Sequence, residues 1–288
     1  MHILITKLSK KYGESIVLNN FNYEFKNGIY GLLGQNGAGK TTFLKILLKL
    51  INTYSGNIEI DGKKLYQMKD NYFAQIGYLP QSLRFYDHFT ASEMMMYIGK
   101  LKAMKEKDVF EYTEMLFKEL NLTNCADKKV GSFSGGMKQR LGICQALINN
   151  PKLVIFDEPT ASLDPIERIN FRNLVSKLSK DKIIIISTHI VEDIAAIANE
   201  VLILKNGIIC ASGTPENLLK SINGKTFEKK VDYSQYNSVI NTIENISTVI
   251  NNGEGYTIRY ISEQKKQDDL TIPNMEEMFI YYSKVKEE

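Results

Sequence analysis

Hydrophobic and polar residues alternate along the beginning of the chain. The alternation runs through residues 2–33, with apolar side chains at Ile3, Phe21 and Phe25. A period of two is typical of strands that bury one face, so we expect antiparallel strands in this region. Its last part, residues 28–33, is apolar throughout and predicts a buried strand.

A second pattern begins at residue 153, where short apolar runs alternate with longer amphipathic segments. Such alternation predicts a parallel sheet with helices on its faces. The strands expected here are 153–157, 182–187 and 201–204, and the helices are 165–180 and 190–198. Asn206-Gly207 predicts a hairpin turn after the last of these strands. Earlier in the chain, further strands are expected at 56–62 and 76–79, and a helix at 42–50.

The middle of the chain, about residues 82–150, is predicted to be almost entirely helical. Thr90 and Glu93 have the spacing of a capping box, and a Met-rich helix is expected over 91–104. A second helix is expected over 108–120. This stretch therefore predicts a helical subdomain inserted into the α/β pattern.

The last part of the chain differs in character from the rest. From about residue 213 it is more polar, with clusters of Asn and Lys, and a last helix is expected over 273–283. We therefore divide the chain into a main domain, 1–212, and a C-terminal accessory segment, 213–288. The composition suits such a soluble protein, because 43% of the 288 residues are hydrophobic and 24% are charged.

Charge and targeting signals narrow the classes of function. A net charge of +3 is too small to indicate binding of nucleic acid. No apolar run approaches the ~18 residues that span a bilayer, and the N-terminus does not resemble a signal peptide. The three cysteines are far apart, which predicts reduced thiols in a cytosolic protein; they are Cys125, Cys144 and Cys210.

The strongest chemical signal is a glycine-rich run that follows the apolar strand 28–33. It matches the phosphate-binding pattern G-x-x-x-x-G-K-[ST] and consists of Gly34, Gln35, Asn36, Gly37, Ala38, Gly39, Lys40, Thr41 and Thr42. The glycines let backbone N–H groups turn toward an anion. Lys40 can reach the β- and γ-phosphates, and the Thr41 hydroxyl can ligate Mg²⁺. The alternative, a glycine-rich turn that binds nothing, is disfavoured by the flanking strand and helix.

Two acids follow the buried strand 153–157. Because ligands bind at the carboxyl ends of parallel strands, we expect Asp157 to meet the Mg²⁺ held by Thr41. Glu158, one residue farther on, can orient and deprotonate water for attack on the γ-phosphate. Taken alone, two acids after a strand are also typical of solvent-exposed residues at the end of a strand, without a role in binding.

Ser134, Gly135, Gly136 and Met137 open another expected helix. Ser134 can cap the helix, and the paired glycines allow backbone N–H groups to approach an anion. A plain helix start would explain Ser134 but not the two glycines, which weaken a helix.

In this order, these motifs resemble the ATP-binding subunit of an ABC transporter. The resemblance covers about residues 2–215 and includes Gln81, Asp164 and His189. It implies an α/β fold: a P-loop NTPase core with a mixed or parallel sheet, an N-terminal antiparallel β subdomain, a helical subdomain and a small C-terminal α+β appendage.

The same resemblance implies roles for single residues. Gln81 matches the residue that links the Mg²⁺ and water site to the helical subdomain. His189 matches the switch histidine that contacts the γ-phosphate and holds Glu158, and Asp164 matches the loop that crosses the dimer interface. Tyr12 matches the aromatic residue that stacks on adenine, although on its own it also fits an ordinary strand residue.

The resemblance further implies a head-to-tail homodimer. Each ATP is then expected between the phosphate loop of one copy and residues 134–137 of the other. The cargo is expected to pass through a separate polytopic permease, which holds this chain at the cytoplasmic face of the membrane. Phe133 and Met137 depart from the usual Leu-Ser-Gly-Gly-Gln signature. The run from Ser134 to Arg140, like the ending 275–282, resembles the exporter branch with bacitracin-type and sodium-efflux-type ATPases.

Sequence therefore predicts an ATPase that uses ATP and Mg²⁺ to power an exporter of a peptide antibiotic, a drug or an ion. Two other classes remain open: a soluble ABC-type ATPase that acts on DNA or ribosomes, and a nucleotide-dependent regulator that does not hydrolyse ATP. The short helical insertion, the single cassette and the slight net charge argue against the first. The presence of both Glu158 and His189 argues against the second.

Overall fold

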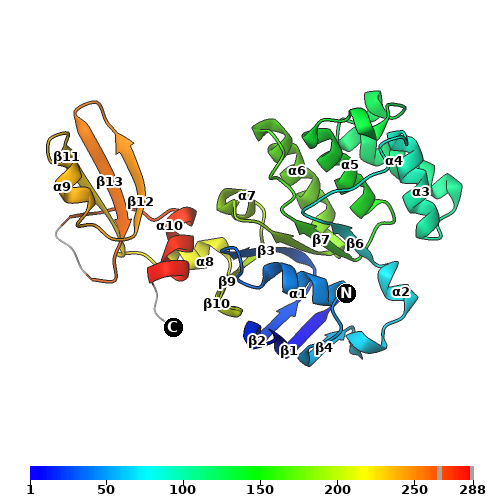
Figure 1. Ribbon diagram of the computed structural model, residues 1–288, viewed down its shortest axis with the longest axis horizontal. Helices are drawn as coiled ribbons and strands as arrows, with labels where there is room; N and C mark the ends of the chain where they lie inside the picture. The colour runs from blue at the N-terminus through cyan, green and yellow to red at the C-terminus, as the bar shows by residue number, and fades with distance from the viewer. Residues whose placement is uncertain (265–267, 286–288) are drawn as a thin grey trace.

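The computed structural model describes residues 1–264 and 268–285 (Figure 1). The strands of these residues form three sheets. The first is antiparallel, with strand order β2-β1-β4-β5; its strands are β1 (Ile3–Tyr12), β2 (Ser15–Phe25), β4 (Ser55–Ile60) and β5 (Lys63–Lys64). Along β1 buried and exposed positions alternate over the first residues, as the period-two pattern predicts.

The second sheet is the centre of the molecule and has the order β10-β9-β3-β8-β7-β6. Its strands are β3 (Gly28–Gly34), β6 (Ile76–Leu79), β7 (Leu153–Asp157), β8 (Ile183–Ser187), β9 (Glu200–Lys205) and β10 (Ile208–Gly213). All neighbours pair in parallel except β10, which pairs antiparallel with β9. The predicted α/β class with a mixed sheet is confirmed.

Strand β3 corrects one expectation. Residues 28–33 lie within the range expected to be antiparallel, yet β3 runs parallel between β8 and β9. Every residue of β3 is buried, because both faces of the central sheet are covered. Gly31 is needed there: a Cβ at this position would lie 2.1 Å from Cγ2 of Ile194.

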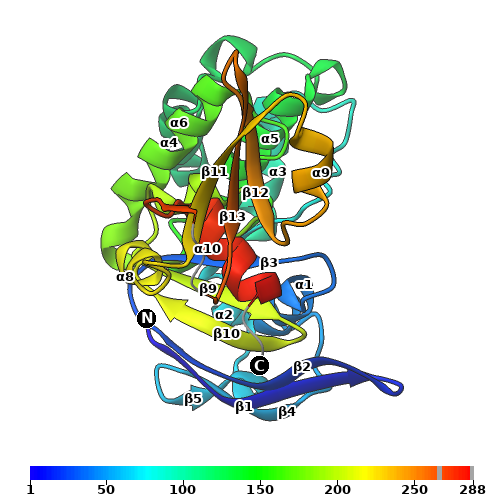
Figure 2. The same ribbon diagram turned by 90° about the vertical axis from the view of Figure 1, so that its left-hand side faces the viewer.

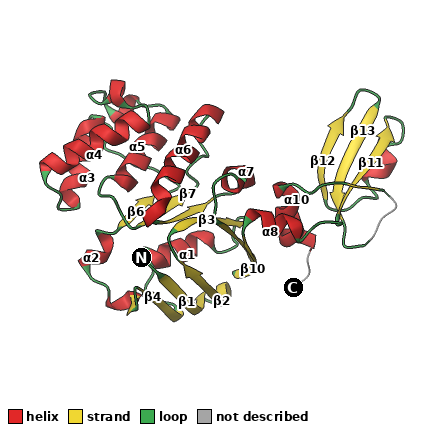
Figure 3. Ribbon diagram, turned by 180° about the vertical axis from the view of Figure 1, so that it is seen from behind, coloured by secondary structure: helices red, strands yellow, loops and turns green. Residues whose placement is uncertain are grey.

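Helices cover the central sheet and build a separate helical region (Figure 3). They are α1 (Lys40–Leu47), α2 (Asp70–Phe73), α3 (Ala91–Leu101), α4 (Glu106–Glu119), α5 (Gly135–Leu147), α6 (Pro165–Leu178) and α7 (Val191–Ala195). Short 3₁₀ turns lie at Leu65–Gln67, Thr123–Cys125, Val130–Ser132 and Ser179–Asp181. The helices expected at 91–104 and 190–198 are shorter than predicted; the first ends before Ala103, whose φ of 54° is left-handed.

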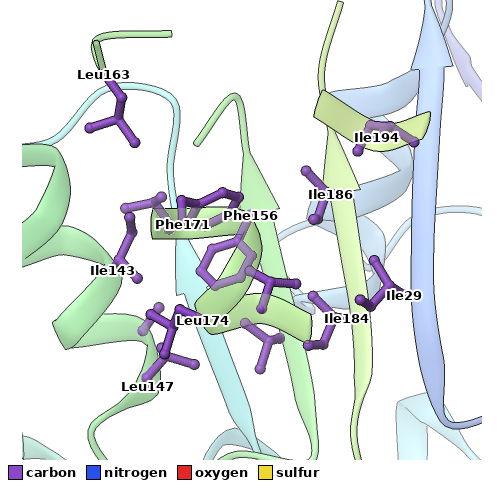
Figure 4. Packing of buried hydrophobic residues seen from close by; sticks show 14 of the residues in the cluster. Ile29, Ile143, Leu147, Phe156, Leu163, Phe171, Leu174, Ile184, Ile186 and Ile194 are labelled. Carbon is purple, nitrogen blue, oxygen red and sulfur yellow. The ribbon is translucent and has the colours of Figure 1, made fainter. Parts of the chain in front are cut away.

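The core lies on both faces of the central sheet. One cluster fills the space between the sheet and the helices α5 and α6, where Phe156 and Phe171 meet edge to face at 5.3 Å (Figure 4). The other cluster joins the first sheet, α1 and the opposite face of the central sheet, with Phe21 stacked on Phe43 at 4.5 Å. Strand β3, which leads into the glycine-rich run, is therefore held rigidly from both sides.

The third sheet belongs to the C-terminal region and lies to one side of the core (Figures 1 and 2). Its order is β12-β13-β11-β14, and its strands are β11 (Thr226–Asp232), β12 (Ile246–Asn251), β13 (Gly255–Ile261) and β14 (Asp269–Leu270). The helices here are α8 (Pro215–Lys220), α9 (Tyr236–Ile240) and α10 (Met275–Ile280). A π-helical turn, Tyr281–Val285, continues α10, so the helix expected over 273–283 begins later and changes its geometry. The division of the chain at residue 212 stays a prediction.

The C-terminal region is anchored to the core through α10, which contacts α7. Glu277 of α10 is fully buried and pairs with Arg259 of β13, whose Nε lies 2.8 Å from Oε1. Among residues 1–264 and 268–285, no helix has the length and apolar character needed to cross a membrane.

Candidate functional site

The glycine-rich run forms the connection between β3 and α1. Gly37 and Gly39 have φ angles of 84° and 104°, which residues with a Cβ rarely adopt. Gly39 also passes close to β2, since a Cβ on it would lie 2.6 Å from the carbonyl oxygen of Val17. This tight turn aims the N-terminus of α1 and its free N–H groups at the space beside the loop.

Lys40 is the first residue of α1 and is buried, with 8% of its surface exposed. Its Nζ donates hydrogen bonds to the carbonyl oxygens of Gly34 at 2.5 Å and Gln35 at 3.1 Å. Burial lowers the pKa of this ammonium group, while the nearby charges of Glu158 and Asp157 act in the opposite direction. The ammonium is thus partly desolvated and held by neutral carbonyls, which an anionic phosphate can replace.

A cavity of about 140 Å³ lies at the loop. It brings together most of the predicted site: its lining residues are Val17, Gln35, Asn36, Gly37, Ala38, Gly39, Lys40, Thr41, Thr42, Gln81, Asp157 and Glu158. The lining thus combines backbone N–H donors, a lysine and two carboxylates. This combination suits a nucleotide phosphate with a divalent cation.

Asp157 ends β7 and is almost fully buried, with 3% of its surface exposed. Its neighbour in the parallel register is Ser187 of β8, whose hydroxyl donates a hydrogen bond to Oδ1. Burial raises the pKa of Asp157, and the Ser187 hydrogen bond opposes this rise.

The donors around Asp157 fit Mg²⁺. Thr41, Gln81 and Asp157 line the same cavity and offer oxygen ligands, namely a hydroxyl, an amide oxygen and a carboxylate. No group of three His, Cys, Asp or Glu residues within 1–264 and 268–285 is arranged to hold a metal ion. A cation here would therefore need oxygens from water and from the nucleotide to complete its shell, as is usual for Mg²⁺.

Glu158 projects beside Asp157 from a strained position. Its φ of 54° is left-handed, which is uncommon for a residue with a side chain, and its side chain is only 11% exposed. Oε2 accepts a hydrogen bond from Oγ1 of Thr188 at 3.3 Å and lies 3.0 Å from Nδ1 of His189. The carboxylate is thus fixed by two residues that follow β8.

The residues expected to act in the partner copy lie elsewhere. Ser134 caps α5, with Oγ accepting a hydrogen bond from the Met137 N–H at 3.2 Å. Asp164 caps α6 in a capping box with Glu167. None of Ser134, Gly135, Gly136, Met137 or Asp164 is among the residues that line the cavity of their own chain.

Tyr12 is not brought to the cavity either. Its side chain is half exposed at the end of β1, with Nζ of Lys10 4.7 Å from the ring centroid. Its role toward adenine stays a prediction. Val17, Ser187 and Thr188 are the site residues that sequence reasoning missed. Only the last two carried a signal, since they lie at the carboxyl end of a predicted strand.

Comparisons with known proteins agree with this geometry. Residues 18–161 match the family model described as "ABC transporter". The chain is 39% identical over 229 residues to the bacitracin transport ATP-binding protein BcrA of Bacillus licheniformis, covering 78% of this chain and 74% of that protein. It is 35% identical over 216 residues to a Nod factor export ATP-binding protein I of Burkholderia lata, covering 74% and 71%.

A solved structure gives the same result for the fold. The dimeric structure of a bacterial ABC transporter cassette superimposes with a TM-score of 0.67 at 27% identity, covering 74% of this chain and 98% of that one.

Proposed function

Because the chain belongs to the ABC transporter family as an ATP-binding subunit, we propose that it hydrolyses ATP as a homodimer to power an exporter formed with a separate membrane permease. The single observation that carries this function is the cavity in which Lys40, Asp157 and Glu158 converge. Lys40 and the loop N–H groups bind the phosphates, and Glu158 acts on water. The chain is an ABC transporter ATPase.

Phosphate binding follows from the loop. The N–H groups around Gly37 and Gly39 and at the start of α1 offer an anion site made of backbone dipoles. When the phosphates enter, Nζ of Lys40 exchanges its neutral carbonyl partners for charged oxygens, which form stronger hydrogen bonds.

Hydrolysis needs a base beside the γ-phosphate. Glu158 lines the cavity, and Thr188 and His189 hold its Oε2 from the same side. We assign to Glu158 the orientation and deprotonation of the attacking water, and to His189 the positioning of that carboxylate. Thr41, Asp157 and Gln81 would hold Mg²⁺, which neutralises charge on the phosphates when bound.

The second half of each ATP site is proposed to come from another copy. Ser134–Gly136 lie outside the cavity of their own chain, at the exposed start of α5, where N–H groups can meet an anion. A head-to-tail dimer brings this helix start onto the phosphate loop of the partner. The dimeric structure of a similar cassette supports the formation of a dimer.

The names of two relatives support the proposed direction of transport. One similar protein is named for the export of Nod factors and another for the transport of bacitracin. We propose an exporter of such a kind, with this chain bound peripherally to a permease at the cytoplasmic face of the membrane. The cargo class remains a peptide antibiotic, a drug or an ion.

A co-purification experiment tests the complete function. The tagged chain is expressed together with its neighbouring reading frames, a polytopic membrane protein is sought in the detergent-solubilised eluate, and ATP hydrolysis by that eluate is measured. We expect the membrane protein to co-elute and the rate to rise relative to the chain alone. Recovery with ribosomes or DNA instead, or no release of phosphate, would support the competing functions.

A further inference from the structure

Gln139 is a buried polar residue that the chemistry described above does not use. It lies in α5, and only 6% of its surface is exposed. Its Nε2 donates a hydrogen bond to the carbonyl oxygen of Pro159 at 2.8 Å and lies 3.4 Å from the carbonyl oxygen of Glu158. Buried polar groups are rarely placed without a partner, and here the partner is the backbone at the candidate base.

The backbone at Glu158 needs such support. Its left-handed φ of 54° is unfavourable for a residue with a Cβ, so the surrounding structure must maintain it. The Glu158 N–H donates to the carbonyl oxygen of Ser187 at 2.9 Å, which ties one side of the turn to β8. The amide of Gln139 holds the other side, so that two elements together determine where the carboxylate points.

We propose that Gln139 is a positioning residue for Glu158 and couples the direction of this carboxylate to the helix that begins at Ser134. This role rests on the proposed function, since it requires Glu158 to act as the base. Gln139 lies about 7 to 8 Å along α5 from Ser134, given a rise of about 1.5 Å per residue. Contact of Ser134 with the nucleotide of a second copy is thereby transmitted to the base of the first.

A neighbouring ion pair makes this connection stiff. Nη2 of Arg140 lies 3.2 Å from Oε1 of Glu167, which belongs to the capping box at the start of α6. Gly136 allows this close approach, because a Cβ there would lie 2.8 Å from Oε2 of Glu167. Thus α5 is bound on one side to α6 and on the other, through Gln139, to the loop that carries Glu158.

The first test compares two leucine variants of the full-length chain. Gln139→Leu keeps the approximate size of the side chain and removes the donor. We expect kcat for ATP hydrolysis to fall at least tenfold and the Kd for ATP to change less than twofold, because Gln139 does not line the cavity. Gln145→Leu is the matched control on the same helix: among the described residues, Gln145 has no side-chain hydrogen bond to Glu158 or Pro159, so its kcat should stay within twofold of wild type.

A double-mutant cycle separates positioning from general damage. In a Glu158→Gln background, Gln139→Leu should change the residual single-turnover rate less than twofold, since the carboxylate through which it acts is already gone. Equal loss in both backgrounds, or an unchanged kcat in the Gln139→Leu variant, would overturn the proposal.

Two further outcomes are also informative. If thermal melting shows that Gln139→Leu does not fold, Gln139→Asn replaces it in the same cycle, because its shorter side chain brings the amide away from the Pro159 carbonyl. If the wild-type chain itself releases no phosphate, the proposed function fails, which is a different result from a wild-type enzyme that is insensitive to Gln139.

Discussion

Nδ1 of His189 lies 3.0 Å from Oε2 of Glu158, and the two residues follow neighbouring parallel strands, β8 and β7. This contact links an exposed imidazole to a nearly buried carboxylate that lines the cavity at the glycine-rich loop. In the proposed function, Glu158 acts on water and His189 keeps its carboxylate in place.

Glu158→Gln should abolish turnover but not nucleotide binding. The amide cannot accept the proton of the attacking water, and loss of a general base costs about 10²- to 10⁴-fold in kcat. The phosphate loop is untouched, so the Kd for ATP measured by equilibrium titration should change less than a few fold. Hydrolysis of ATP at the wild-type rate by this variant would show that Glu158 is not the general base.

His189→Ala should lower kcat about tenfold or more, because the Glu158 carboxylate loses one of the contacts that fix it. The hydrogen bond from Thr188 to Glu158 remains, so the carboxylate stays partly fixed. Steady-state phosphate release is the measurement, and a change in KM without a change in kcat would argue for a binding role instead. His88→Ala, an exposed histidine outside the cavity, is the control.

Lys40→Ala should weaken ATP binding. A hydrogen bond to a charged group contributes about 1.5–3 kcal/mol, which corresponds to roughly a 10- to 150-fold rise in Kd. The same variant leaves Gly34 and Gln35 without their lysine partner, so a melting curve should accompany the titration. Unchanged affinity would contradict the role of Lys40.

Much of this site follows from sequence, and the exceptions have physical causes. The motifs at 34–42 and 157–158 meet in one cavity because both follow parallel strands of one sheet. The hydrophobic pattern of residues 28–33 did not reveal that β3 pairs in parallel with β8 and β9. Strand pairing depends on contacts between segments that are distant in sequence. The sequence carries no signal for the contacts of Gln139, because its partners are carbonyl oxygens of a turn that only the folded chain brings near.

The C-terminal region should become less stable at acid pH, when Glu277 takes up a proton. Burial alone would raise the pKa of this carboxyl, but hydrogen bonds from Arg259, the Asn274 N–H and Ser247 outweigh burial and lower it. A lowered folded-state pKa stabilises the fold above the unfolded value, about 4.3, and this contribution is lost as pH falls through the folded pKa.

Chemical denaturation between pH 7 and pH 3 measures this dependence. Arg259→Met removes one partner of the buried pair and should cost about 3–5 kcal/mol at neutral pH. Glu277→Gln should flatten the part of the pH dependence that comes from this group. An unaltered pH profile in Glu277→Gln would show that the pair does not control acid stability.

ATP-driven dimerisation of the Glu158→Gln chain tests the central claim most directly. Sedimentation with ATP should give a dimer. Adding Gly135→Glu should return it to a monomer with unchanged ATP affinity. A Cβ at position 135 would meet only Cβ of Ser162, at 3.9 Å, so the backbone has room for a side chain there. In the proposed dimer the added negative charge would lie next to the phosphates bound by the other copy and repel them. A monomer without Gly135→Glu, or a dimer that persists with it, would contradict an ATP site shared between two copies.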